Sequence, residues 1–306
     1  MNRFKQIAII GQTASGKSAL ALELAQKHNG IILSIDSLSV YRYIDIASAK
    51  PSKEELLSVP HYGIDIVDPN EEFNVTKLFE HYKEAYSYAK SKKIPLIIVG
   101  GSSFYLKMML EGISPLPKIS KATKERLNLI MQNRSKAYEM LFDIDKEYAI
   151  NISSSDSYRI EKGLSIFLEC GIKATTYFQN NPPQKCIRDP LPIYAISINR
   201  DILKNRISNR TRQMLKSGLI DEVAYLEAKY GRDYPSMKAI GIVEVLDYFD
   251  GKLSYEELHP KISTNTARLA KRQNTFNKSQ FNNIEYKEYK ELYSAVDNYL
   301  LNDKLD

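Results

Sequence analysis

The sequence predicts an α/β protein whose core is a doubly wound, parallel β-sheet. The first observation is a set of short, continuously apolar runs at residues 6–10, 31–35 and 94–99. Uninterrupted apolar runs are typical of parallel strands that are buried on both faces. The second observation is a helical pattern between the runs, as at residues 17–27. Alternation of strands with helices predicts a parallel sheet with helices on both faces.

Each of the three apolar runs leads into a residue suited to a tight turn or to chemistry. Gly11 follows the first run, Asp36 the second, and Gly100 the third. Ligands of doubly wound proteins bind beyond the carboxyl ends of the parallel strands. We therefore expect these three positions to border one binding site.

The chain is expected to form two domains. Strand patterns stop after residue 117, and the next segment shows helical spacing only. The run Ile193–Ile198 reads as a strand that rejoins the sheet, and the remainder to about residue 300 reads as mostly helical. We expect residues 1–117 and 191–306 to form the core domain, with a largely helical C-terminal part, and residues 118–190 to form a helical insertion domain.

Composition favours an ordinary globular protein over a membrane or metal-rich one. Of 306 residues, 43% are hydrophobic and 26% charged, and no stretch approaches the ~20 apolar residues that a membrane span needs. The two cysteines, Cys170 and Cys186, and the four histidines are scattered, without the spacing of a zinc site. We expect a cytoplasmic monomer with no structural metal and no membrane contact.

The charge distribution points to a polyanionic partner. The net charge is +6, and residues 200–280 hold 15 lysines and arginines against 10 acidic residues. An excess concentrated in one stretch is the expected footprint of a nucleic-acid-binding face. A modest overall excess alone would settle little, because many proteins carry as much.

The sequence between the first strand and the first helix is a phosphate-binding P-loop. It fits G-x-x-x-x-G-K-[ST], and the flanking strand and helix give the pattern its required context. Backbone N–H groups of such a loop surround phosphate oxygens, the lysine pairs with the outer phosphate, and the final hydroxyl can ligate Mg²⁺. The diphosphate-binding residues predicted in this way are Gly11, Gln12, Thr13, Ala14, Ser15, Gly16, Lys17 and Ser18. Ser18 is the predicted magnesium ligand.

The identity of the bound diphosphate is left open by the motif itself, because most P-loops are nucleotide-binding and serve ATP or GTP. No guanine-reading N-K-x-D is present, and the strand at residues 94–99 ends in Gly100 where an acidic residue would be usual. An acid does follow another strand, as Asp36. It could accept a proton from a nucleophile, or it could be a helix N-cap or a ligand in the outer shell of magnesium.

Successive blocks of the sequence resemble the tRNA dimethylallyltransferase family. The blocks occur in the family's order from residue 6 to about residue 280, and as a combination they are highly specific. They are Gly11–Ser18, Asp36–Tyr41, Ile46–Pro51, Pro60–His61, Asp65–Pro69, Val99–Ser102 with Tyr105–Leu106, Gly112–Pro117, Met214–Leu219 and Ala270–Gln273.

The resemblance implies a P-loop fold with a helical insertion and a prenyltransferase activity that modifies tRNA. Members of the family transfer a dimethylallyl group from dimethylallyl diphosphate to N6 of adenosine 37, next to the anticodon, with Mg²⁺. Carried over by motif, Asp36 is implied as the general base, while Lys17 and Arg210 stabilise the departing diphosphate. Ser102 stands where the family usually has threonine and supplies a hydroxyl.

The resemblance also implies a set of tRNA-binding residues. Arg159 matches a tRNA-contacting arginine of the family, whereas Lys162 replaces a second one. Further departures are Ile242, Val243 and Phe276, which bear on how tRNA is held and not on the diphosphate site. The expected tRNA-binding residues are Asp36, Ser37, Leu38, Ser39, Ser102, Arg159, Lys162, Arg268, Lys271 and Arg272.

Two other functions use part of the same pattern. A nucleotide-dependent small-molecule kinase would employ the P-loop and Asp36, but it gives no reason for the blocks after residue 60. A non-catalytic RNA-binding P-loop protein does not explain why Asp36 and Ser102 both follow strands.

Overall fold

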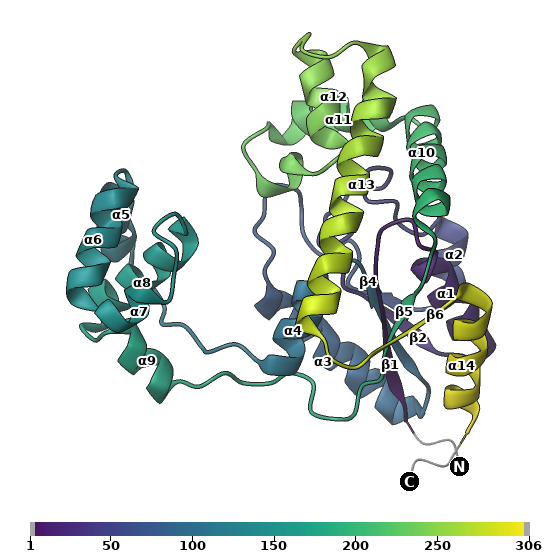
Figure 1. The fold of residues 1–306 in the computed structure, drawn as a ribbon, viewed down its shortest axis with the longest axis horizontal. Coiled ribbons are helices and arrows are strands. Elements are labelled where there is room, and N and C mark those ends of the chain that lie inside the picture. Colours follow the sequence, from purple (N-terminus) through teal and green to yellow (C-terminus); the bar gives the residue numbers. More distant parts are fainter. Residues whose placement is uncertain (1–3, 303–306) are drawn as a thin grey trace. The chain divides into compact units, whose positions relative to one another are not determined.

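A computed structural model of the chain describes residues 4–302, which form two compact units, residues 4–108 with 187–302 and residues 109–186 (Figure 1). The first unit contains a six-stranded sheet in the order β3-β2-β4-β1-β5-β6, and all five neighbouring pairs are parallel. The predicted α/β fold class is confirmed. The strands are β1 (Gln6–Ile10), β2 (Ile31–Ser34), β3 (His61–Tyr62), β4 (Leu96–Gly100), β5 (Ile193–Ile196) and β6 (Ile284–Lys287).

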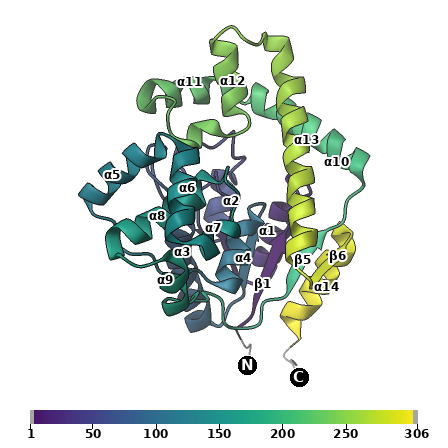
Figure 2. The same ribbon diagram turned by 60° about the vertical axis from the view of Figure 1, so that its left-hand side comes forward.

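The apolar runs form the strands because both faces of the sheet are covered. Every residue of β1, β2 and β4 is buried. Helices α1 (Lys17–Lys27) and α14 (Tyr289–Leu301) pack on one face, while α3 (Val75–Lys92) packs on the other, as the views in Figures 1 and 2 show. This layering confirms the doubly wound arrangement.

Strand boundaries differ from the predicted ones at proline and at the sheet edge. β4 begins at Leu96, after Pro95, which has no N–H for the ladder. The strand β6 was not predicted, since its residues Ile284–Lys287 were expected in a mostly helical segment. It pairs only with β5, at the edge of the sheet.

The second half of the first unit is mainly helical and is built around a long helix. Its helices are α10 (Arg200–Lys216), α11 (Leu219–Tyr230), the short 3-10 turn η1 (Pro235–Lys238), α12 (Ile242–Phe249) and α13 (Tyr255–Gln280). Helix α13 packs along α10, and an apolar cluster around Leu203, Ile207 and Ala270 joins the two helices beside the P-loop. The remaining helices of this unit are α2 (Lys53–Ser58) and most of α4 (Ser103–Glu111).

The second unit is a helical bundle with its own core. It comprises α5 (Lys121–Met131), α6 (Arg134–Ile144), α7 (Lys146–Ile150), α8 (Ser157–Cys170) and α9 (Ala174–Asn180). Leu127, Leu141 and Leu164 pack together at its centre. The carboxylate of Asp145 is buried and accepts bonds from Tyr148 N and from both Thr175 N and its hydroxyl, which ties α7 to α9. Within the described residues, no helix is both long and apolar enough to cross a membrane.

Candidate active site

One cavity of about 720 Å³ lies beyond the carboxyl ends of the strands of the first unit. The four predicted catalytic residues line it together, namely Lys17, Asp36, Ser102 and Arg210. They come from the P-loop, from the segments after β2 and β4, and from α10. The structure thus brings together residues that lie up to 193 positions apart in the sequence.

The P-loop has the backbone shape of a phosphate cradle. Gly11, Ala14 and Gly16 all have positive φ angles, of 144°, 62° and 102°. Ala14 is a non-glycine residue in the left-handed region, a conformation that persists only where its surroundings impose it. Alternation of right- and left-handed residues turns successive N–H groups toward one side, where an anion can sit.

Lys17 projects from the first turn of α1 into a buried position. Its side-chain nitrogen lies 3.3 Å from the carbonyl oxygen of Gln12. Burial lowers its pKa to about 8, an effect that Asp36 opposes and the positive charge of Arg210 reinforces. A diphosphate would supply the negative charge that this buried lysine lacks.

Arg210 approaches the P-loop from α10. Its Nη1 donates to the hydroxyl of Thr13 at 3.0 Å. Burial lowers the pKa of Arg210, and Asp36 partly opposes this effect. The guanidinium and Lys17 together make this end of the cavity positive.

Asp36 is placed by a turn of the chain at the end of β2. Its Oδ1 accepts from Leu38 N at 2.9 Å and from Ser39 N at 3.4 Å. In residues 4–302 no hydrogen bond involves the second oxygen, Oδ2, which leaves it available to a ligand. Asp36 does not cap a helix, because these two N–H groups belong to a turn outside any helix.

Ser102 connects the segments that follow β4 and β2. Its hydroxyl accepts from Ser37 N at 3.0 Å and donates to the Ser37 hydroxyl at 3.1 Å. The close approach depends on Gly100, because a Cβ there would lie 2.8 Å from the backbone carbon of Ile35. Ser102 therefore holds the Asp36 segment in place as well as bordering the cavity.

The far wall of the cavity is apolar and aromatic, a feature that the sequence did not single out. It includes Tyr41, Phe73, Tyr105 and Met214. Burial, then the nearby Tyr41 and Asp36, raises the pKa of Tyr105 to about 12, so this side chain stays a neutral hydroxyl. Scattered aromatic residues give no local signal of a shared wall.

The loop that carries part of this wall is fixed by Glu222 of α11. Its carboxylate accepts from the backbone N–H groups of Asp45, Ile46 and Ala47, at 2.7 to 2.9 Å. Burial raises the pKa of Glu222, although the three N–H donors oppose the shift. Ala47 and Ser48, at the end of this loop, line the cavity.

Not every predicted site residue borders the cavity. Ser18 is exposed at the start of α1 and is not part of the cavity lining. Ser39 is buried, and its hydroxyl lies 3.0 Å from that of Ser34, away from the cavity. Ser37 and Leu38 do line it.

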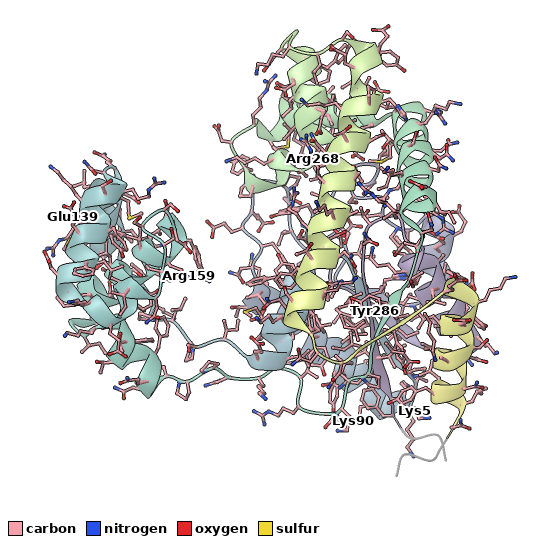
Figure 3. The ribbon with its side chains drawn as sticks, in the orientation of Figure 1. Lys5, Lys90, Glu139, Arg159, Arg268 and Tyr286 are labelled. Atoms are coloured by element: carbon pink, nitrogen blue, oxygen red, sulfur yellow. The ribbon has the colours of Figure 1, made fainter. Side chains whose placement is uncertain are left out.

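The predicted basic tRNA-binding residues fall into three places. Arg272 lines the cavity, whereas Arg268 and Lys271 line a separate groove of about 680 Å³ between α10 and α13. On α8 of the second unit, Arg159 is exposed and pairs with Asp156 at 2.9 Å, whereas Lys162 is half-buried and lies over the Tyr158 ring. Figure 3 shows Arg268 on α13 and Arg159 on the helical unit.

Two side chains that hold the P-loop had no assigned role in the sequence. Gln273 of α13 accepts from Thr13 N, and Arg206 of α10 donates to the Ser15 carbonyl at 2.9 Å. Gln273 belongs to a block that the sequence did single out, but the spacing of 260 residues from Thr13 hides the contact.

Comparisons with known proteins show which family the chain resembles. The family model described as IPP transferase matches residues 39–280. Curated tRNA dimethylallyltransferases are 53% identical in Sulfurovum sp., over 92% of this chain and 93% of the relative, and 54% identical in Nautilia profundicola, over 90% and 92%.

Solved structures show the same fold. The tRNA isopentenylpyrophosphate transferase of Bacillus halodurans is 28% identical with a TM-score of 0.69, covering 97% of this chain and 95% of that one. A eukaryotic dimethylallyltransferase solved acting on tRNA is 23% identical with a TM-score of 0.80, covering 93% and 74%. The sequence resemblance is confirmed, and the chain belongs to the IPP transferase family.

Proposed function

We propose that this protein transfers a dimethylallyl group from dimethylallyl diphosphate to N6 of adenosine 37 in tRNA, releasing diphosphate. The observation that carries the proposal is the single cavity with a cationic phosphate cradle at one end and Asp36 beside it. The family membership and the relatives named tRNA dimethylallyltransferase support it.

The P-loop, Lys17 and Arg210 would stabilise the departing diphosphate. An allylic carbon can ionise partly as its bond to oxygen breaks, so stabilisation of the departing diphosphate lowers the barrier. Fixed N–H groups and buried cations act most strongly where charge develops in a site shielded from water. The aromatic and apolar wall would contact the uncharged prenyl chain, while the P-loop holds the charged diphosphate.

Asp36 would activate the nucleophile, which is the exocyclic amine of adenosine. The exocyclic amine of adenosine is weakly nucleophilic and loses a proton as the new C–N bond forms. Oδ2 of Asp36 would accept this proton, while Oδ1 remains engaged by the turn. The adenosine must leave its stack to reach the cavity, as is general for enzymes that act on nucleobases.

The Ser18 hydroxyl, next to Lys17 in the first turn of α1, is the protein oxygen through which magnesium would bind. Mg²⁺ is usually bound by one or two protein oxygens together with substrate phosphates and waters. Consistent with this, the described residues contain no cluster of three or more His, Cys, Asp or Glu that could hold a metal unaided. The Ser18 hydroxyl and diphosphate oxygens would hold the ion, which supplies charge stabilisation for the leaving diphosphate when bound.

The tRNA would be held by basic residues of both units. Exposed cations are suited to phosphate contacts, and they are Arg268, Lys271 and Arg272 on α13 and Arg159 on α8; Lys162 on α8 is half-buried. We propose that the protein acts in the cytoplasm, where tRNA is present, and as a monomer, because one unit supplies every residue that lines the cavity.

Labelled substrates separate this function from the two alternatives. Bulk tRNA is incubated with Mg²⁺ and either radiolabelled dimethylallyl diphosphate or ATP labelled in the γ-phosphate. The proposal expects label in tRNA from the prenyl donor only. Phosphoryl transfer from ATP to a small molecule would indicate a kinase, and tRNA binding without transfer would indicate a non-catalytic protein.

A further inference from the structure

Gln273 lies where the central strand pair of the sheet ends. β1 and β4 pair in register from Gln6 with Leu96 to Ile10 with Gly100. Beyond that point one chain enters the P-loop and the other turns toward Ser102. The two segments have no further backbone ladder to fix their separation.

The side-chain amide of Gln273 spans this gap. Its Oε1 accepts from Thr13 N at 2.8 Å, and its Nε2 donates to the carbonyl oxygen of Gly101 at 3.0 Å. One group accepts from the first segment and donates to the second, as an inserted peptide unit would. The amide therefore bridges the P-loop and the segment that follows β4, beyond the end of the β1–β4 ladder.

The position of Gly101 shows how close this contact is. A Cβ on Gly101 would lie only 2.4 Å from Nε2 of Gln273, a distance that would displace the amide. The φ angle of Gly101 lies outside the positive region, so backbone conformation does not require glycine here. The amide of Gln273 is the nearest atom group that a side chain at 101 would meet.

Helix α13 also holds the P-loop at a second point. Nε2 of Gln12 donates to the carbonyl oxygen of Ala270 at 3.3 Å, one turn before Gln273. The loop is thus fixed to α13 by two hydrogen bonds, and Gln273 alone extends the connection to the β4 side.

Hydrogen bonds continue from Gly101 to the proposed base. Ser102, the next residue, accepts from Ser37 N, and Ser37 follows Asp36. The series Thr13, Gln273, Gly101–Ser102 and Ser37 joins the diphosphate cradle to the segment that carries Asp36.

We propose that Gln273 is a positioning residue that sets the distance between the diphosphate cradle and the Asp36 segment. The inference rests on the proposed transfer reaction, because that reaction needs the allylic carbon and the amine aligned between these two halves. Each half would still bind its own substrate without Gln273, but their alignment would be lost.

The expected signature is a loss in the chemical step rather than in binding. A misplacement of about 1 Å in a bound reactant can cost roughly a hundredfold in rate. Most N–H groups of the P-loop, with Lys17 and Arg210, remain for the diphosphate, so its affinity should change little.

The test uses Gln273→Met, which keeps the length and helix preference of the side chain and removes both hydrogen bonds. Single-turnover transfer is measured at saturating tRNA and dimethylallyl diphosphate, with the Kd of each substrate and the thermal midpoint. We expect the rate to fall about a hundredfold, while each Kd stays within about threefold. Gln26→Met, an exposed glutamine near the end of α1, is the matched control and should behave as wild type.

Gly101→Ala provides an independent way to displace the same amide. It should lower the rate as Gln273→Met does, and the double variant should be no slower than either, because both changes remove one contact. It also decides the matter if Gln273→Met does not fold.

Two results would overturn the inference: transfer by these variants within about threefold of wild type, or a loss that saturating dimethylallyl diphosphate restores. Wild-type protein in the same assay separates the two claims. If it transfers no prenyl group, the proposed function fails; if it transfers and both variants match it, only the role of Gln273 fails.

Discussion

The two oxygens of Asp36 have different surroundings in the structure. Oδ1 holds the turn through Leu38 N and Ser39 N, while Oδ2 is left for a ligand. Asparagine can present its single amide oxygen to the same two N–H groups but cannot take up a proton at neutral pH. The residue therefore allows structure and chemistry to be separated by one substitution.

We predict that Asp36→Asn lowers single-turnover transfer by ~10²–10⁴-fold, the usual cost of removing a general base. The thermal midpoint and the affinity for dimethylallyl diphosphate should stay near those of wild type. A variant that is clearly destabilised, yet turns over normally once Mg²⁺ is saturating, would show that Asp36 is structural and that the base lies elsewhere.

Lys17 gives the site a pH dependence. Because its pKa is lowered to about 8, the side chain is charged below that pH and progressively neutral above it. Diphosphate prefers the charged form, so its affinity should weaken as pH rises through about 8, approaching about tenfold per pH unit. The measurement is the Kd of dimethylallyl diphosphate between pH 6.5 and 9.5.

Lys17→Arg is the control, since arginine stays protonated throughout this range and the ligand's own ionisation is the same for both proteins. Its curve should be flatter than that of wild type. Parallel curves for the two proteins would show that Lys17 does not titrate in the site.

Sequence reasoning succeeded at positions where chemistry is encoded locally. The P-loop is one continuous motif between a strand and a helix, and Asp36 follows a strand directly, so both could be placed at the sheet edge. Ser39 was expected among the tRNA-binding residues, but the structure buries it, with its hydroxyl against that of Ser34. Contacts such as Gln273 with Thr13 join distant segments, and no periodicity in the sequence reports them.

At the scale of elements, α13 borders the proposed binding sites of both substrates. Its Gln273 contacts the P-loop, Arg272 lines the cavity, and Arg268 and Lys271 border the neighbouring groove. The sequence predicts a basic helical face for RNA but does not show which surface each cation lies on. In the structure all three cations border one shallow pocket on α13, while Arg272 also lines the cavity and Arg268 and Lys271 also line the groove.

We predict that Arg272→Ala and the double change Arg268→Ala with Lys271→Ala each reduce the salt dependence of tRNA binding. Removal of one phosphate contact lowers the slope of log K against log salt by roughly 0.7–0.9. Binding is measured from low to moderate salt, with Lys278→Ala on the same helix as the matched control. If all three changes are combined and the slope is still that of wild type, this helical face is merely solvated and does not contact RNA.

The strand β6 shows where element prediction fails. It has four residues, at the edge of the sheet, and its two central residues are exposed. The strands β2 and β5 are equally short but largely apolar and buried, whereas two of the four residues of β6 are charged, so no apolar run marks it in the sequence. The long buried strands were recognisable because both of their faces are covered.

At the scale of the whole molecule, the parallel sheet could be predicted from alternation of strands and helices, but its strand order could not. The order β3-β2-β4-β1-β5-β6 depends on which crossovers pack best, and β1 ends up between strands from residues 96–100 and 193–196. That order brings the P-loop next to Gly101 and Ser102. The predicted insertion domain, residues 118–190, remains a prediction. The structure has a compact unit at residues 109–186.

The central claim is that one cavity joins a prenyl diphosphate to an adenosine of tRNA. Its most direct test is nucleoside analysis by mass spectrometry of tRNA that lacks the modification, after incubation with the protein, Mg²⁺ and dimethylallyl diphosphate. We predict one new nucleoside, an adenosine heavier by a dimethylallyl unit on N6 and located next to the anticodon, and its absence with Asp36→Asn. Unmodified tRNA from the wild-type reaction, or a prenyl group on another atom or nucleoside, would contradict the account.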